Sequence, residues 1–218
     1  HFGLERERGS IAPGRRAELI LTSSLEELPI ETVIARGVTV AEGGVLKVEC
    51  PHYDWPEHAR QTVHMGAEKS AADFEIEAPA RANHVTARVI GVVENQAPTK
   101  ALIAELPVKD GLVETHGDVC QIALVERHRA TGGVTNAFVS GFGYKGPMAM
   151  ASTVAHDSHH MIVVGTDRAN MAAAANRLAE VGGGMCVFQN GAETALVELP
   201  IAGLMSDSPA REVAAKAD

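Results

Sequence analysis

The sequence predicts an α+β protein in which a small group of strands is followed by a mixed, mostly antiparallel α+β domain. Short apolar runs recur between glycine and asparagine turns, one long amphipathic segment carries helix signals at both ends, and a polar stretch without periodicity separates two structured parts. We therefore expect strands within residues 1–50, a linker over residues 51–81, and a C-terminal domain over residues 82–218.

Residues 11–48 read as three or four short strands with turns. β-Branched and aliphatic residues supply the strand propensity, and Gly43-Gly44 offers the positive φ angles that a two-residue hairpin needs. Ser24 and Glu27 have the spacing of a capping box, which predicts one helical turn. So few strands bury little apolar surface, and we expect this part to need further strands from elsewhere.

The linker shows one possible short helix, at residues 57–63, and the C-terminal domain then begins with a run of strands. The expected strands cover residues 85–93, 101–106, 119–125, 134–139, 161–165, 185–189 and 194–200. The clearest helix begins after Thr166 or Asp167 and ends at Gly182-Gly183-Gly184, with Met171, Ala174, Leu178 and Val181 on one stripe. A last helix over residues 210–217 is expected to take Ser208 as its cap.

Composition narrows the class of protein. The 218 residues carry a net charge of −9, which disfavours a nucleic-acid partner because any basic patch must act against the field of the whole molecule. No apolar run reaches the length that spans a bilayer, so we expect no membrane partner and a soluble, cytoplasmic protein. Three distant cysteines predict buried free thiols. The chain opens on His1, and both ends look cut from a longer parent.

The densest polar cluster is the run Ala155-His156-Asp157-Ser158-His159-His160 between two apolar stretches. An extended run would put His156, Ser158 and His160 on one face, whereas a helical run would put His156 and His160 at the spacing of a metal-binding pair. Unpaired polar groups buried in such a setting cost about 1 to 3 kcal/mol each. The cluster is therefore either a satisfied structural network or a functional loop.

A second candidate is the glycine-rich segment Gly141-Phe142-Gly143-Tyr144. It lacks the strand, helix and acid of a dinucleotide-binding unit, so it predicts either turns between strands or a mobile aromatic wall for a planar ligand. Glu126-Arg127-His128 ends a predicted strand, and such charged residues are expected to be solvated.

Three segments together resemble the carboxyl-terminal part of bacterial adenine deaminases of the amidohydrolase superfamily. They are GSIAPGRRAELIL, the run from GFGYKG through AHDSHH and VVGTD to GGG, and LVELPIAGLMSD. The resemblance covers nearly the whole chain and implies that residues 1–50 are the end of a catalytic (β/α) barrel and the completing strands of a small β-sandwich. The barrel itself is not in this chain. His160 stands where the family is expected to favour Asn.

This resemblance implies a hydrolase acting on a cyclic amidine, converting adenine and water to hypoxanthine and ammonia. It also implies Mn²⁺ or Fe²⁺ in the barrel, with no metal ligand in this chain, and a fragment that is inactive alone. The cluster would act as a wall or lid, with His156, Asp157 and His159 as catalytic candidates and with Phe142, Gly143 and Ser158 against the substrate. The implied partners are adenine, the barrel of the same polypeptide, and further subunits of a homo-oligomer.

Two alternatives belong to other classes. A non-catalytic assembly module would use the same sheet to pack subunits and would bury the polar cluster as a hydrogen-bond network. An independent metal protein would bind through His156 and His160, with Asp157, Cys120 or His128 as a third ligand.

Overall fold

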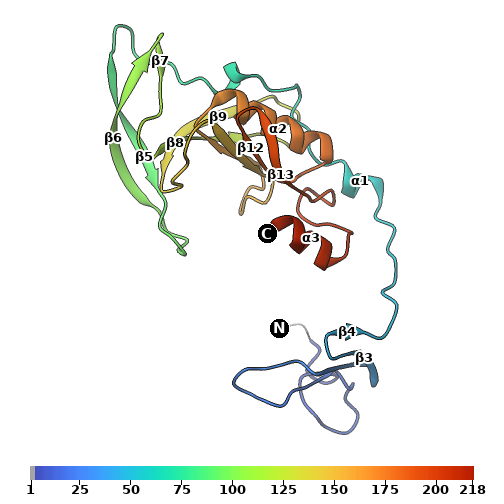
Figure 1. Ribbon diagram of the computed structural model, residues 1–218. Helices are drawn as coiled ribbons and strands as arrows, with labels where there is room; N and C mark the ends of the chain where they lie inside the picture. Colours follow the sequence, from blue (N-terminus) through green and yellow to red (C-terminus); the bar gives the residue numbers. More distant parts are fainter. Residues whose placement is uncertain (1–2) are drawn as a thin grey trace. The chain divides into compact units, whose positions relative to one another are not determined.

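A computed structural model describes residues 3–218, and the chain divides into two units between Asp54 and Trp55 (Figure 1). The first unit holds one antiparallel four-stranded sheet in the order β1-β2-β3-β4. Its strands are β1 (Leu19–Leu21), β2 (Thr32–Ala35), β3 (Val38–Glu42) and β4 (Val45–Leu46). As expected, Gly43 and Gly44 have positive φ angles and form the hairpin between β3 and β4.

The predicted helical turn in this unit is present as a single turn, closed by a hydrogen bond of 3.1 Å from the Leu28 amide to the Ser24 carbonyl. Residues 25–27 form a turn, in which the Ser24 hydroxyl accepts a hydrogen bond from the Glu27 amide at 3.2 Å.

None of residues 3–54 is buried. Several apolar side chains on the strands are instead more than half exposed, among them Ile20 at 59% and Val45 at 60%. This sheet therefore has no core of its own.

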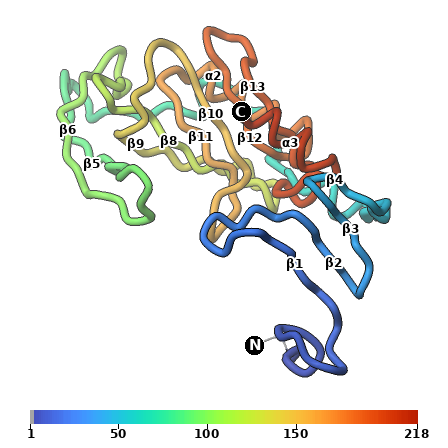
Figure 2. The backbone as a smooth tube through the Cα atoms, turned by 60° about the horizontal axis from the view of Figure 1, so that its bottom comes forward, coloured from blue at the N-terminus to red at the C-terminus, as the bar shows by residue number. Residues whose placement is uncertain are grey.

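The second unit is a nine-stranded sheet in the order β13-β12-β10-β11-β8-β9-β5-β6-β7 (Figure 2). Its strands are β5 (His84–Gly91), β6 (Lys100–Lys109), β7 (Leu112–Val113), β8 (Val119–Val125), β9 (Val134–Ser140), β10 (Met148–Ser152), β11 (Met161–Gly165), β12 (Gly184–Gln189) and β13 (Ala192–Glu198). Strands β5 and β9 are parallel, and the other pairs are antiparallel. The predicted α+β class with a mostly antiparallel sheet is confirmed.

Helix α2 (Arg168–Val181) covers one face of this sheet. The Asp167 side chain accepts a hydrogen bond from the Asn170 amide at 2.8 Å, and Gly182 ends the helix in the left-handed conformation. Met171, Ala174 and Leu178 are fully buried, while Val181 is half-buried. They pack on alternate residues of β8, β10 and β11, which form the main core.

Residues 51–81, which we expected to form a linker, instead belong for the most part to the second unit. It contains α1 (Glu57–Arg60) and the 3₁₀ helix η1 (Ala71–Phe74), and the contact boundary lies at residue 54. Met65 and the fully buried Phe74 enter the α2 core. Asn176 on α2 also exchanges two hydrogen bonds of 2.8 Å with the backbone of Lys69. The buried side chains of Met65 and Phe74, together with the two hydrogen bonds of Asn176, thus hold residues 55–81 against the rest of the second unit.

The last helix, α3 (Ala210–Ala217), matches the expected range, but its cap does not. Pro209 precedes the helix without a side-chain hydrogen bond, and the Ser208 amide donates to the Ser206 hydroxyl at 3.1 Å. Lys216 pairs with Glu198 of β13 at 2.5 Å, which ties the helix to the edge of the sheet. No helix of residues 3–218 has both the length and the apolar character to cross a membrane.

Candidate functional site

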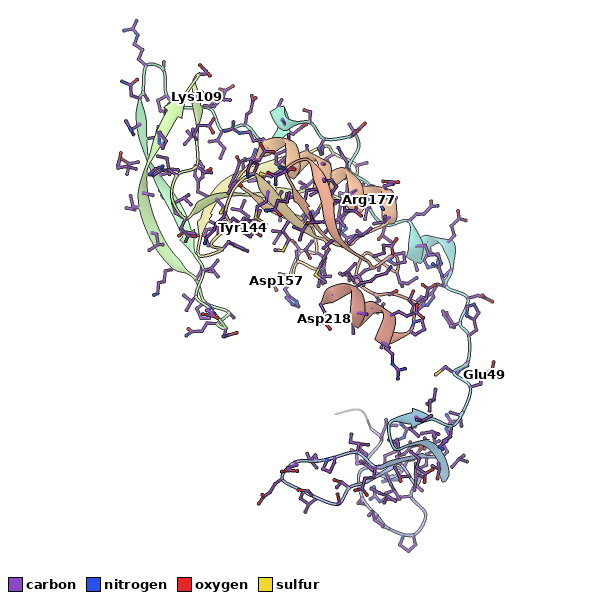
Figure 3. All side chains as sticks on the ribbon, in the orientation of Figure 1. Glu49, Lys109, Tyr144, Asp157, Arg177 and Asp218 are labelled. Atoms are coloured by element: carbon purple, nitrogen blue, oxygen red, sulfur yellow. The ribbon has the colours of Figure 1, made fainter. Side chains whose placement is uncertain are left out.

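The polar cluster forms the loop between β10 and β11, and we call residues 153–160 the β10–β11 loop. Figure 3 shows Asp157 on this loop, where it extends beyond the sheet. The loop is neither extended nor helical. The Ser158 amide donates to the His156 carbonyl at 3.0 Å, and the His159 amide donates to the Ala155 carbonyl at 2.7 Å. A tight turn therefore replaces both geometries that the sequence left open.

This turn places two non-glycine residues in the left-handed region, with φ of 71° at Asp157 and 49° at His159. Such conformations cost about 1 to 2 kcal/mol per residue and persist only where surrounding structure holds them. The backbone of the loop is therefore held by contacts outside the turn.

The side chains of the loop divide into an exposed tip and a half-buried base. His156, Asp157 and Ser158 are exposed, so the tip is not the buried hydrogen-bond network that the assembly-module alternative requires. His159 and His160 are half-buried, and within residues 3–218 the Nδ1 atom of each ring is buried without a hydrogen-bond partner. The exposed tip offers one imidazole, one carboxylate and one hydroxyl to a ligand, whereas the two histidines of the base are partly enclosed.

Arg127 lies beneath this base and is 2% exposed, which corrects the expectation of a solvated side chain. Its Nε donates to the His159 carbonyl at 2.6 Å, and its Nη2 donates to the Ala202 carbonyl at 3.2 Å. Nη1 donates to the Thr62 carbonyl at 3.2 Å and to the Thr62 hydroxyl at 3.4 Å. Burial lowers the pKa of this guanidinium from its usual range.

His128 follows Arg127 and also contacts the β10–β11 loop. Its Nε2 donates to the Ser158 carbonyl at 2.9 Å, because a carbonyl oxygen can only accept, and this fixes the proton on Nε2. Its ring centroid lies 4.8 Å from that of His160. The rings of His156 and His159 are 6.3 Å apart. His160 thus pairs with His128 rather than with His156.

The aromatic segment lies at the opposite end of the same strands. Val119, at the start of β8, faces Ser140 of β9, whereas Val125, at its end, faces Met161 beside the β10–β11 loop. Six residue steps along a strand span roughly 20 Å. The structure therefore gathers His156, Asp157, Ser158 and His159 in one loop and does not bring Phe142 and Gly143 to their end of the sheet.

Asp118 holds this aromatic segment in place. Its carboxylate accepts hydrogen bonds from the Ser140 hydroxyl at 2.8 Å and from the amides of Gly141 and Gly143 at 2.7 and 2.9 Å. These bonds, led by the one from Ser140, lower the pKa of the Asp118 carboxyl. The segment is thus a turn held in place by three hydrogen bonds to the Asp118 carboxylate.

The ring of Phe142 lies 5.3 Å from that of Tyr144, and both pack on a small cluster around Cys120. Burial raises the pKa of Tyr144 to about 12 and that of Cys120 to about 11. Both groups are therefore neutral at physiological pH and act as packing groups. The expectation of free cysteines with buried thiols holds for Cys120 and Cys186, while Cys50 is exposed.

The metal alternative finds no geometric support. Within residues 3–218, no three His, Cys, Asp or Glu side chains converge on a common point suited to an ion. Cys120 lies near the start of β8, and His128 follows its end, so they cannot share an ion. The described residues, 3–218, therefore do not fit the Mn²⁺ or Fe²⁺ that the family resemblance implies.

The face of the sheet opposite α2 presents an apolar surface beside the loop. Leu124, Ile162, Ser152 and Met185 stand side by side across four neighbouring strands. Leu124 is 37% exposed and Met185 is 38% exposed, whereas the row on the other face is buried under α2. A cavity of 610 Å³ lies elsewhere, beside α2, and is lined by residues 65–68 and the outer side of the helix.

Comparison with known proteins gives the family. A family model described as the adenine deaminase C-terminal domain matches residues 96–218, which include the β10–β11 loop. The chain is 79% identical over 217 residues to a protein named adenine deaminase from Ruegeria sp. (strain TM1040), and 68% identical over 214 residues to one from Paracoccus denitrificans. It is 43% identical over 217 residues to another from Moorella thermoacetica.

These matches cover 100%, 98% and 99% of this chain. They cover only 36% of each relative, so the chain spans about a third of the length of the curated proteins that it matches. Both the family model and the full-length coverage of the chain lead to one conclusion: the chain belongs to the adenine deaminase family and contains its C-terminal domain.

Proposed function

We propose that this chain is the C-terminal part of an enzyme that hydrolyses adenine to hypoxanthine and ammonia, and that its β10–β11 loop forms a wall or lid over the active site. The observation that carries the proposal is the combination of an exposed polar tip with a fixed base in that loop. His156, Asp157 and Ser158 are open to solvent, while buried Arg127 fixes the backbone below them. This is how a preorganised ligand contact is built.

The relatives support adenine as the substrate, because proteins named adenine deaminase match the chain over its whole length. A purine offers ring nitrogens and an exocyclic amine to hydrogen-bond partners. Asp157 can accept from an amine or a ring N–H, and His156 can donate to or accept from a ring nitrogen. We propose that these two side chains orient the purine and that His159, at the half-buried base, helps to exclude water.

The catalytic barrel, with the Mn²⁺ or Fe²⁺ that the resemblance implies, belongs on this proposal to the part of the enzyme outside this chain. The apolar surface around Leu124, Ile162 and Met185 supports packing against that part, because it adjoins the loop and is left open by α2. The chain without the barrel is then expected not to deaminate adenine, and further copies of the enzyme would assemble as a homo-oligomer.

The test compares two loop variants in the metal-loaded, full-length enzyme. Asp157→Asn should lower adenine turnover per folded molecule by about 30-fold to 1,000-fold, since a hydrogen bond that tightens in the transition state is worth about 2 to 4 kcal/mol. His159→Ala should also lower it, because this variant removes the ring that is proposed to exclude water. Melting temperatures should change little for Asp157→Asn, because its side chain is exposed. The measurement is ammonia release at saturating adenine together with the melting temperature.

Asp110→Asn is a matched control for Asp157→Asn. Asp110 is also an exposed aspartate with a positive φ angle, 53°, but it lies in the turn between β6 and β7. The control should retain normal turnover. Normal turnover per folded molecule in both loop variants would make the loop purely architectural and would refute the lid.

A further inference from the structure

Arg127 connects three segments that are distant in sequence. Its three nitrogens point to Thr62 before the sheet, to His159 in the β10–β11 loop, and to Ala202 after β13. Every acceptor is an uncharged oxygen. The side chain is therefore used for the divergent directions of its donors rather than for an ion pair.

Two of these acceptors belong to residues with unusual backbone conformations. His159 has a φ of 49° and Ala202 has a φ of 58°, both in the left-handed region that non-glycine residues seldom adopt. The adjoining Gly203 has a φ of 69° and packs directly on the guanidinium, where an added Cβ would lie 2.8 Å from Nη1. Strained backbone thus surrounds Arg127 on two sides, and its hydrogen bonds hold that backbone.

We propose that Arg127 is a positioning residue that sets the conformation of the β10–β11 loop through the carbonyl of His159. It does not reach a ligand, because it is 2% exposed. Its effect passes from the His159 carbonyl through the turn to Asp157 and His156. The consequence for turnover rests on the function proposed above, whereas the effect on the loop does not.

Lysine cannot replace arginine in this role, although it keeps the charge. A lysine carries its three N–H bonds on one nitrogen, so it cannot reach three carbonyl groups that lie in different directions. Arg127→Lys is therefore expected to lose the bond to His159 and to free the loop. Lys69 offers a matched control, because it is a second buried cation that donates to backbone carbonyls, those of Met65 and Gly132, away from the loop.

The experiment measures hydrogen exchange by mass spectrometry in the full-length, metal-loaded enzyme. Peptides covering residues 154–161 should exchange about tenfold faster or more in Arg127→Lys than in the native enzyme, because a charged hydrogen bond to the loop is lost. Peptides in α2 should be unchanged. Lys69→Met should leave residues 154–161 unchanged. Adenine turnover in Arg127→Lys should fall at least tenfold, with kcat affected more than KM.

The outcomes separate the two proposals. Native exchange of residues 154–161 in folded Arg127→Lys would overturn the positioning role. Faster exchange with normal turnover would support the positioning role and refute the lid function of the loop. Should Arg127→Lys fail to fold, Arg127→Gln gives the same comparison, because its neutral amide removes the buried charge. Native loop exchange in that variant would equally overturn the proposal.

Discussion

Single carboxylates fasten the turns at both ends of β8. Asp118 precedes the strand, and Glu126 follows it. Glu126 accepts hydrogen bonds from the Thr131 amide and hydroxyl, both at 3.0 Å, and from the amides of His128 and Arg129 at 2.5 and 2.8 Å. These bonds, led by that from the Thr131 amide, lower its pKa to about 2. Glu126 thereby orients the segment that carries Arg127 and His128 to the loop.

Asp118 predicts a pH dependence at this scale. Its folded-state pKa lies below its ordinary value of 3.8, so its ionised form stabilises the protein above pH 3.8 and this contribution is lost as the pH falls through the folded pKa. Asp118→Asn should cost about 1 kcal/mol or less at pH 7, because the group is exposed. Urea unfolding should show that the native protein loses this advantage as the pH is lowered from 5 toward 2.

Asp110→Asn, at an exposed turn, is the control for Asp118→Asn. Its stability relative to the native protein should not follow the same pH course. The free energy of unfolding of the native protein could instead exceed that of Asp118→Asn by as much at pH 2 as at pH 7. That result would contradict the stabilising role assigned to the ionised Asp118 carboxylate.

The residue scale also shows which part of the site was readable from sequence. Five consecutive polar residues between apolar strands identified the β10–β11 loop. Arg127 was not identified, because its acceptors are backbone carbonyls at residues 62, 159 and 202, and carbonyl groups leave no signal in a sequence. In the sequence, Arg127 stands out only as one of three charged residues at the end of a strand, with Glu126 and with His128, which is also a candidate metal ligand.

Elements were predictable where local signals decide them. The ranges of β8, β11, α2 and α3 follow from apolar runs, an aspartate cap and terminal glycines. Strand β10 was missed because its sequence, Met-Ala-Met-Ala-Ser, has helix-forming rather than β-branched residues. Tertiary packing decides it instead, since Ala149 and Ala151 are fully buried under α2. The small side chains let the helix approach the sheet closely.

Close packing at Gly184, the first residue of β12, gives a prediction at the scale of the elements. A Cβ on Gly184 would lie 2.0 Å from the Val197 carbonyl oxygen, at a φ of 139°. Gly184→Ala should therefore cost about 3 kcal/mol or more, because the β12–β13 pairing must shift. Gly191→Ala is the matched control, since Gly191 also has a positive φ, 80°, but an added Cβ meets open space. Its cost should be about 1 to 2 kcal/mol.

Thermal or urea unfolding of both glycine variants decides between steric and conformational effects. Equal losses of stability in Gly184→Ala and Gly191→Ala would show that the positive φ angle alone is responsible, and would contradict the role assigned to the close approach of β12 and β13.

For the whole molecule, the two units differ in what supports them. Residues 55–218 have a continuous core under α2, with Phe74, Met161, Met171 and Leu178 fully buried. Residues 3–54 have strands and hairpins but no buried residue. Hydrogen bonds between strands are worth little net free energy in water without apolar burial. The first unit is therefore expected to be stabilised by the further strands that a composite sandwich supplies.

Amide hydrogen exchange tests this expectation. In the 218-residue chain, amides of β2 and β3 should exchange within about 100-fold of the rate in an unfolded chain, whereas those of β9 should be protected by about 10⁴-fold or more, because β9 is an interior strand of the larger sheet. In the full-length enzyme, β2 and β3 should gain protection while β9 keeps its own. Protection of Val33 and Ile34 in the isolated chain that equals that of Val139 would refute the composite sandwich, because it would show that these four strands hold together without a buried core.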